Sequence, residues 1–144
     1  MSIFGRAKLR ESFMEKKEIM HPEKRDKSFS TGAYSSGVVV DGWLFVSGQG
    51  PIDFKTSKFV LGTIEEETRL TLHNIKCIVE AAGCSMNDVV KCTVHLADIN
   101  DFDAYNAIYA SYFSGIKPAR TTVQSGLSQG IKIEIDAIAK VPVK

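Results

Sequence analysis

The most regular region of the chain begins at residues 37–49 (GVVVDGWLFVSGQ), which contain two short apolar runs. Two such runs are joined by Asp41-Gly42, a pair that accepts the positive φ angles of a type I′ turn. The pattern therefore predicts a β-hairpin that ends at Gly48, Gly50 and Pro51. A further short strand is expected near 58–60.

Two later stretches have helical periodicity. In the first, Thr63 and Glu66 have the spacing of a capping box and Gly83 suits the end of the helix. Its predicted buried stripe consists of Ile64, Thr68, Thr71, Leu72, Ile75, Ile78, Val79 and Ala82, and His73 lies opposite it, as a solvated surface histidine. The second helix is expected over about 102–113, with an aromatic core stripe of Phe102, Tyr105, Ile108, Tyr109, Tyr112 and Phe113.

The remaining regular segments alternate with the period of a strand. One face of the predicted strand over 88–98 (DVVKCTVHLAD) contains Val90, Cys92, Val94 and Leu96, and the other contains Lys91, Thr93 and His95. Further strands are expected over 121–124 and 131–139. In the last one, an isoleucine and alanine row faces the core, so Glu134 lies on the opposite face.

The order of these elements predicts a two-layer α+β domain, in which a mixed sheet carries two helices on one face. The other face is uncovered and semi-apolar. We therefore expect a homo-oligomer that closes over this face, with ligand clefts between its subunits. Residues 1–30 are polar and are interpreted as a mobile N-terminal extension with a short helix over 6–19, so the domain itself would comprise residues 31–144.

The composition and the motif content of the chain exclude several classes of function. The net charge is +1, although residues 1–27 hold eight Lys and Arg against five Asp and Glu. Three scattered cysteines and three isolated histidines predict neither a disulfide scaffold nor a metal cluster. Glycine-rich nucleotide loops and hydrolase motifs are missing, so no cofactor is expected. Without an apolar stretch of membrane length or a secretory leader, a cytoplasmic protein with no membrane partner is predicted.

Arg120 and Glu134 are the candidates for chemistry, on two strands that we expect to be neighbours in the sheet. Pro118 precedes Arg120, whose planar fork can grip a carboxylate through two hydrogen bonds. Glu134 can orient a water molecule or act as a general base. The residues alone also permit a simpler interpretation, in which Arg120 and Glu134 pair with each other or with Asp136 as surface charges.

Three blocks of this sequence resemble the RidA (YjgF) family of reactive-intermediate imine deaminases. They are AYSSGVVVDGWLFVSGQGPID, the segment from AAG to the IYASYF run, and PARTTV followed by GIKIEIDAIA. The resemblance covers residues 31–141. It implies a chorismate-mutase-like fold, a homotrimer with three inter-subunit clefts, and hydrolysis of 2-imino acids, formed from the enamines that pyridoxal-phosphate-dependent dehydratases release, to 2-keto acids and ammonia without a metal or cofactor.

The resemblance also implies roles for particular residues. Arg120 would hold the substrate carboxylate and Glu134 would position the attacking water. The expected substrate-binding residues are Tyr34, Ser47, Gly48, Gln49, Asn106, Ala119, Thr121 and Thr122. The chain departs from the family pattern at Ala33, where the family has proline, at Thr122, where cysteine is frequent, and in the turn 127–130. These differences bear on substrate range.

Two other functions fit the same sequence. The chain could be a non-catalytic trimer that binds 2-keto acids at the Arg120 cleft. It could also be an endoribonuclease or translation inhibitor, although the near-zero net charge and the lack of a basic, aromatic surface disfavour nucleic acid as a partner.

Overall fold

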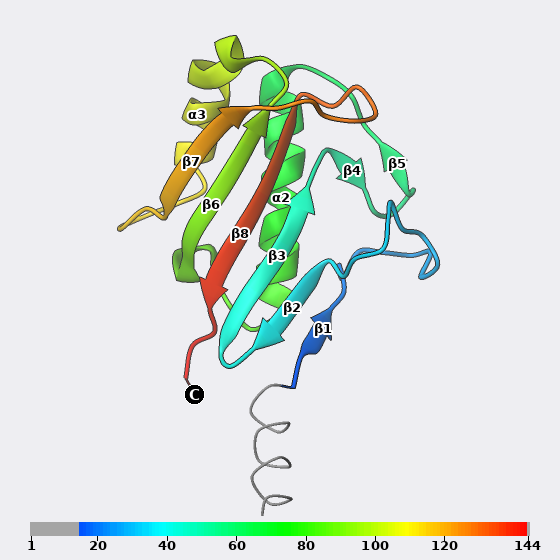
Figure 1. Cartoon of the computed structure of the whole chain (residues 1–144), viewed down its shortest axis with the longest axis vertical. Coiled ribbons are helices and arrows are strands. Elements are labelled where there is room, and N and C mark those ends of the chain that lie inside the picture. The colour runs from blue at the N-terminus through cyan, green and yellow to red at the C-terminus, as the bar shows by residue number, and fades with distance from the viewer. Residues whose placement is uncertain (1–14, 144) are drawn as a thin grey trace, which may run out of the picture.

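A computed structural model describes residues 15–143, which form one six-stranded sheet with two helices against one face (Figure 1). The strand order is β1-β2-β3-β8-β6-β7, and β6 and β7 are the parallel pair. The sheet strands are β1 (Lys17–Ile19), β2 (Gly37–Val40), β3 (Trp43–Gln49), β6 (Val89–Leu96), β7 (Ala119–Gln124) and β8 (Ile133–Lys140). The two-layer α+β prediction is thereby confirmed.

The helices and the smaller elements lie outside this six-stranded sheet. They are α2 (Ile64–Ala81), α3 (Phe102–Ala110), the 3-10 turns Met86–Asp88 and Ile99–Asp101, and a separate two-stranded ribbon of β4 (Ile52–Asp53) and β5 (Lys58–Phe59). No helix within residues 15–143 is long and apolar enough to cross a membrane. The short strand expected near 58–60 corresponds to β5.

The hairpin of β2 and β3 turns at the residues that the sequence indicated. Asp41 and Gly42 have φ angles of 53° and 76°, as a type I′ turn requires. At the other edge of the hairpin, β1 pairs with β2 in antiparallel register. Lys17–Ile19 therefore form a strand, and the helix expected over 6–19 is wrong for these residues. The rest of that expected helix falls on residues 1–14, outside the described part of the chain.

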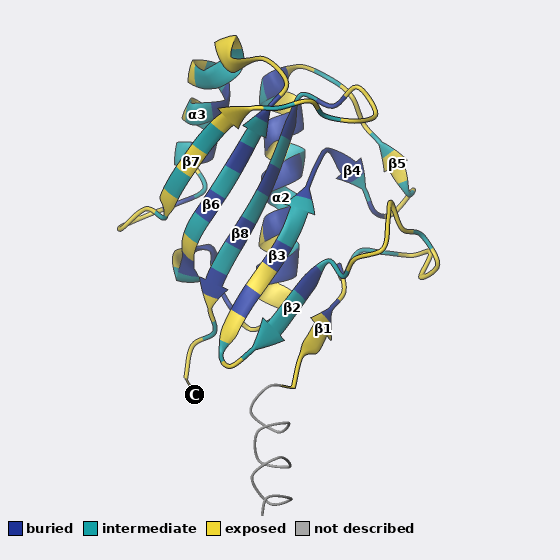
Figure 2. Ribbon diagram, in the orientation of Figure 1, coloured by how far each residue is buried: buried dark blue, intermediate teal, exposed yellow. Residues whose placement is uncertain are grey.

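Helix α2 begins with the predicted capping box, in which the Thr63 side chain accepts a hydrogen bond from the backbone N–H of Glu66. Its apolar stripe is buried against the sheet, which explains the alternating buried bands of Figure 2. The sequence pattern missed two polar residues in this stripe, Glu67 and Asn74, each 1% exposed. Both are satisfied by hydrogen bonds to segments outside the helix.

The central strands follow the predicted alternation with one exception. Ile133, Ile135, Ala137 and Ala139 of β8 are buried, and the residues between them are half-buried. In β6, however, Val90 is 43% exposed, whereas the prediction placed it in the core. A bulge between Val89 and Lys91 causes the difference, because it adds one residue to β6 and turns Val90 outward.

Helix α3 is shorter than the expected 102–113 and ends at Ala110. Tyr105, Tyr109 and Phe113 are buried, as the aromatic stripe predicted, and Phe102, Ile108 and Tyr112 are half-buried. The helix connects β6 to β7 in a parallel crossover and so lies behind these two strands (Figure 1).

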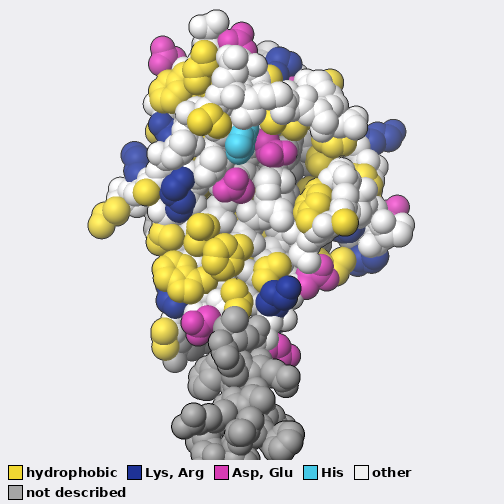
Figure 3. Space-filling view, in the orientation of Figure 1, with side chains coloured by type: hydrophobic (Ala, Val, Ile, Leu, Met, Phe, Trp, Pro, Cys, Tyr) yellow, Lys and Arg dark blue, Asp and Glu magenta, His cyan; other side chains and the backbone are white. Residues whose placement is uncertain are grey.

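The second face of the sheet carries no helix and faces the viewer in Figure 3. Cross-strand pairing places Val38, Phe45 and Ile138 in one row of this face, and Trp43 in the next. Trp43 is 38% and Phe45 is 44% exposed. The hydrophobic cluster in Figure 3 lies beside a region with a histidine and acidic side chains. The semi-apolar open face expected from the sequence is thus present.

The expectation of isolated histidines is wrong for two of the three. His21 and His73, fifty-two residues apart, lie near the same acidic residue and the same cysteine, Glu23 and Cys77. Because the contributing segments are distant in the sequence, the spacing of these residues gave no signal.

Candidate active site

Arg120 lies in β7, and its side chain points toward the helix layer. Its pairing partner in β6 is Cys92, which is fully buried on that side of the sheet. Nη1 of Arg120 donates a 2.7 Å hydrogen bond to Oδ1 of Asn106 in α3. The two residues line a hollow of about 310 Å³ together with Tyr109, Ala110, Lys117 and Pro118, which we name the guanidinium hollow.

Aromatic rings of α3 support the guanidinium. Its central carbon lies 5.4, 5.3 and 4.8 Å from the ring centroids of Phe102, Tyr105 and Tyr109. Burial raises the pKa of both tyrosine hydroxyls, so they stay neutral beside the cation. Among residues 15–143, the ion pairs do not include Arg120. The site therefore presents an oriented positive charge with the capacity to bind an anion.

Glu134 lies in β8 on the open face, opposite His95 of β6 in register. It lines a hollow of about 240 Å³ with Thr31, Tyr34, Ser47 and Gly48, which we name the carboxylate hollow. A Cβ atom at Gly48 would lie 2.9 Å from the Glu134 carboxyl carbon. Only glycine lets the carboxylate lie this close to the backbone of β3.

A second bulge shapes the same hollow. Between Val46 and Gln49, β3 has one residue more than β8 opposite it, so Ser47 and Gly48 leave the regular ladder. The Ser47 hydroxyl donates a 2.6 Å hydrogen bond to the carbonyl of Ser35, and the Gln49 amide donates one of 3.0 Å to the carbonyl of Ser47. The first bond joins the loop that carries Tyr34 to the strand beside Glu134, and the second lies within β3 at the bulge.

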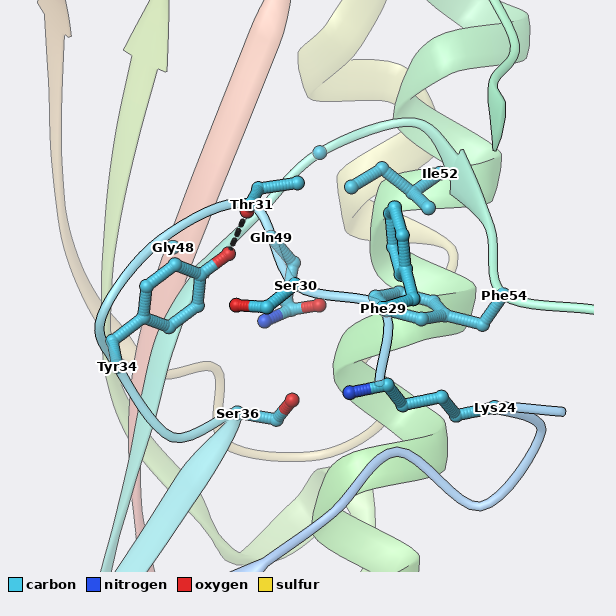
Figure 4. A pocket seen from close by; sticks show the side chains of 11 residues that line it. Lys24, Phe29, Ser30, Thr31, Tyr34, Ser36, Gly48, Gln49, Ile52 and Phe54 are labelled. Atoms are coloured by element: carbon cyan, nitrogen blue, oxygen red, sulfur yellow. Dashed lines mark hydrogen bonds between the residues drawn. The ribbon is translucent and has the colours of Figure 1, made fainter. Parts of the chain in front are cut away.

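Tyr34 extends over this region from the loop before β2 and is 51% exposed. Its hydroxyl is hydrogen-bonded to the hydroxyl of Thr31 (Figure 4). Beside it, a small cavity is lined by the amine of Lys24, the hydroxyls of Ser30 and Ser36, and the rings of Phe29 and Phe54 (Figure 4). The sequence analysis missed Lys24 and Thr31, because neither belongs to a recognisable motif.

The two hollows are not joined within one chain. β6 lies between β7 and β8, so the expectation that Arg120 and Glu134 occupy neighbouring strands is wrong. Register places Arg120 level with buried Cys92 on the helix side and Glu134 level with His95 on the open side. A direct Arg120–Glu134 ion pair is therefore ruled out within this chain, and no ion pair in residues 15–143 joins Arg120 to Asp136.

The other expected substrate-binding residues divide between these surfaces. Tyr34, Ser47 and Gly48 line the carboxylate hollow, and Gln49 is buried behind it. Asn106 lines the guanidinium hollow, and Thr122 lies on the same side of β7, where its hydroxyl bonds that of Tyr105 at 2.5 Å. Ala119 and Thr121 face the open side, level with Lys91 and Thr93.

The sequence and the fold match one class of protein. A family model described as endoribonuclease L-PSP matches residues 25–141. A RutC family protein of Pyrococcus horikoshii is 48% identical over 85% of this chain and 97% of its own length. The 2-iminobutanoate/2-iminopropanoate deaminase of Rattus norvegicus is 49% identical over 75% of this chain and 80% of its own.

A solved structure of the same class is TdcF of E. coli with bound serine. It is 35% identical, has a TM-score of 0.77, and the match covers 86% of this chain and 98% of that one. The chain described here belongs to the endoribonuclease L-PSP family, to which the RidA and YjgF proteins also belong. The family resemblance found in the sequence is confirmed.

Proposed function

We propose that this protein hydrolyses 2-imino acids to 2-keto acids and ammonia, in clefts between the subunits of a homotrimer. The observation that carries the proposal is the oriented guanidinium of Arg120. It is supported by three rings, hydrogen-bonded to Asn106, and outside the ion pairs of residues 15–143. Relatives named as imine deaminases act on small molecules that carry one carboxylate, which this fork suits.

The separation of the two hollows supports an assembly of several subunits, and the family resemblance implies that this assembly is a trimer. Because Arg120 and Glu134 point to opposite sides of one sheet, a cleft that contains both needs the guanidinium hollow of one subunit and the carboxylate hollow of another. The apolar row around Phe45 supplies a surface that a second copy would bury. The structure of TdcF with bound serine supports small-molecule binding in this family.

The reaction needs little from the protein. Arg120 would hold the substrate carboxylate through two hydrogen bonds and so fix the C=N bond in the cleft. Glu134 would accept a proton from water as the water oxygen bonds to the imine carbon, and it would pass this proton to the imine nitrogen. In the resulting carbinolamine, the hydroxyl proton would be transferred to the amino nitrogen, so that the C–N bond breaks, ammonia leaves and the C=O of the keto acid forms. Tyr34 would cover the bound substrate, and Ser47, Gly48 and Gln49 would form the wall.

A coupled assay tests the proposal. A threonine dehydratase would supply the enamine and imine, and the rate of keto-acid formation would be compared with and without this protein. We expect Arg120→Ala to lose all acceleration while its circular dichroism spectrum stays unchanged. Arg69→Ala, on the exposed side of α2, is the matched control and should retain the full rate. An unaltered rate in Arg120→Ala would refute the assignment.

The same assay separates the alternatives. A non-catalytic trimer would bind 2-keto acids in calorimetry, and Arg120→Ala would abolish this binding, but imine decay would not be accelerated. The matched family carries the name endoribonuclease L-PSP. An endoribonuclease would cleave single-stranded RNA in a salt-dependent way and would lose this activity on deletion of residues 1–27. The predicted cytoplasmic location stays a prediction from the sequence.

A further inference from the structure

A cluster of metal-binding side chains lies away from both hollows, where the segment after β1 crosses α2. His21 and Glu23 come from this segment, and His73 and Cys77 come from one turn of the helix at positions i and i+4. None of the four lines the guanidinium or the carboxylate hollow. The imidazole, thiol and carboxylate groups are the ligand types that zinc takes in proteins.

Three of the four side chains lie close enough together to share a single ion. The ligand atoms of His21, Glu23 and Cys77 lie within 4.8 Å of one another. Nε2 of His73 lies 2.8 Å from Oε1 of Glu23 and 3.4 Å from Sγ of Cys77. Ligands at bond lengths of about 2.0 to 2.3 Å from a tetrahedral zinc ion stand about 3.3 to 3.8 Å apart. His73 does not lie within 4.8 Å of all three other residues, so its side chain has to rotate before the four atoms reach coordination geometry.

His21 supplies the second, independent observation. Its ring is fully buried, and Nε2 bonds Oδ1 of Asn74 at 2.9 Å. The Asn74 amide cannot be reversed, because its Nδ2 donates to the carbonyls of Gly50 and Ile52. Nε2 must therefore carry the hydrogen, and Nδ1 is the ring nitrogen with a lone pair, which accepts the backbone N–H of Glu23 at 3.1 Å. Metal-binding histidines are oriented by this kind of outer hydrogen bond.

Two simpler interpretations explain less. A surface ion pair of Glu23 with His73 and Lys55 accounts for the exposed side of the cluster but not for the thiol of Cys77 beside it. A reactive cysteine is disfavoured, because burial raises the pKa of the Cys77 thiol to about 11 and keeps it protonated at neutral pH.

We propose that His21, Glu23, His73 and Cys77 form a binding site for a zinc ion. On binding, Cys77 loses its proton to solvent, Nδ1 of His21 exchanges the Glu23 N–H for the metal, and the two charges of zinc are balanced by the thiolate and the carboxylate. The complete site carries no net charge, which suits its half-buried position. It would fasten the segment after β1 to helix α2, and it does not depend on the proposed activity.

Zinc binding to the full chain tests this inference. After treatment with a chelator and gel filtration, the protein is titrated with Zn²⁺ by calorimetry, and with Co²⁺ to detect the absorption band of a cobalt–thiolate bond. We expect about one ion per chain, a Tm that rises with the Zn²⁺ concentration, and the thiolate band. His73→Gln and Cys77→Ser, which change half-buried residues, should each weaken binding by about tenfold or more.

Two variants provide matched controls. His95→Gln and Cys84→Ser remove one histidine and one cysteine elsewhere in the fold and should bind zinc like the parent protein. Circular dichroism establishes that each variant is folded. The inference is overturned if the parent protein takes up no zinc, or if His73→Gln and Cys77→Ser bind zinc as tightly as the two controls.

Discussion

At the residue scale, the environment of Arg120 is what distinguishes it from an ordinary surface arginine. Its guanidinium lies against three aromatic rings, and one of its nitrogens is bonded to Asn106. A long side chain usually loses conformational entropy when it binds a ligand. Folding has already removed much of the conformational entropy of Arg120, so its guanidinium loses little more when it binds a carboxylate.

Asn106 should therefore act on substrate binding. We expect Asn106→Ala to raise KM for the imino acid by roughly ten- to a hundredfold, because a hydrogen bond to a charged group contributes about 1.5 to 3 kcal/mol, and to leave kcat nearly unchanged. Steady-state kinetics in the coupled assay measures both constants. Asn87→Ala, at the exposed 3-10 turn, is the control. A fall in kcat with an unchanged KM would contradict the positioning role.

At the scale of the elements, α2 is joined to the start of β8 by a buried carboxylate. Glu67 accepts the backbone N–H of Lys132 at 2.8 Å and that of Gly62 at 3.1 Å, and it forms an ion pair with the Lys132 amine at 3.2 Å. The Glu67 carboxylate thus accepts hydrogen bonds from the ends of two loops. These bonds fix the entry of β8 into the sheet, two residues before Glu134.

Loss of this charge should destabilise the fold. We expect Glu67→Gln to lower the free energy of unfolding by about 2 kcal/mol or more, because the amide cannot satisfy the same three donors. Urea denaturation at fixed protein concentration measures the change. Glu80→Gln removes an exposed partner of Lys76 and should change stability by less than about 0.5 kcal/mol. Equal effects of the two substitutions would show that Glu67 does not have this role.

Much of the secondary structure could be predicted from the local sequence. The Asp41-Gly42 turn, the Thr63 cap and the alternation of β8 are properties of a few adjacent residues, and each was predicted correctly. The exposed Val90 and the short strand β1 could not be predicted, because a bulge and an edge pairing depend on the partner strand. The buried Glu67, Asn74 and His21 were missed for the same reason, since their hydrogen-bond partners lie far along the chain.

The candidate site was predicted as a set of residues but not as an arrangement. The pattern of the C-terminal strands identified Arg120 and Glu134 as candidates, and the family resemblance assigned their expected roles. Their strands follow each other in the chain, which suggested that they are neighbours. The parallel crossover through α3 instead places β7 outside β6, and the order of strands is a property of the whole sheet.

At the scale of the whole molecule, the opposite placement of the two hollows makes a test of assembly possible. Arg120→Ala and Glu134→Gln should each be inactive alone. When the two variants are mixed in equal amounts and their subunits exchanged, about one quarter of the clefts in random trimers combine an intact arginine with an intact glutamate. We therefore expect recovery of about a quarter of the parent activity in the coupled assay.

Each variant, taken alone through the same exchange treatment, is the control. Native mass spectrometry of differently tagged chains establishes that mixed assemblies have formed. Mixed trimers without any recovered activity would mean that both groups act within one subunit.

The position of β8 has a consequence for how the polypeptide emerges from the ribosome. This strand follows every other strand in the chain, yet it lies between β3 and β6 at the centre of the sheet. Until it has been synthesised, β1 to β3 and β6 to β7 are two fragments with no ladder between them. Folding of the nascent chain therefore awaits its final strand, and the exposed inner edges of both fragments are the surfaces that a chaperone would have to shield.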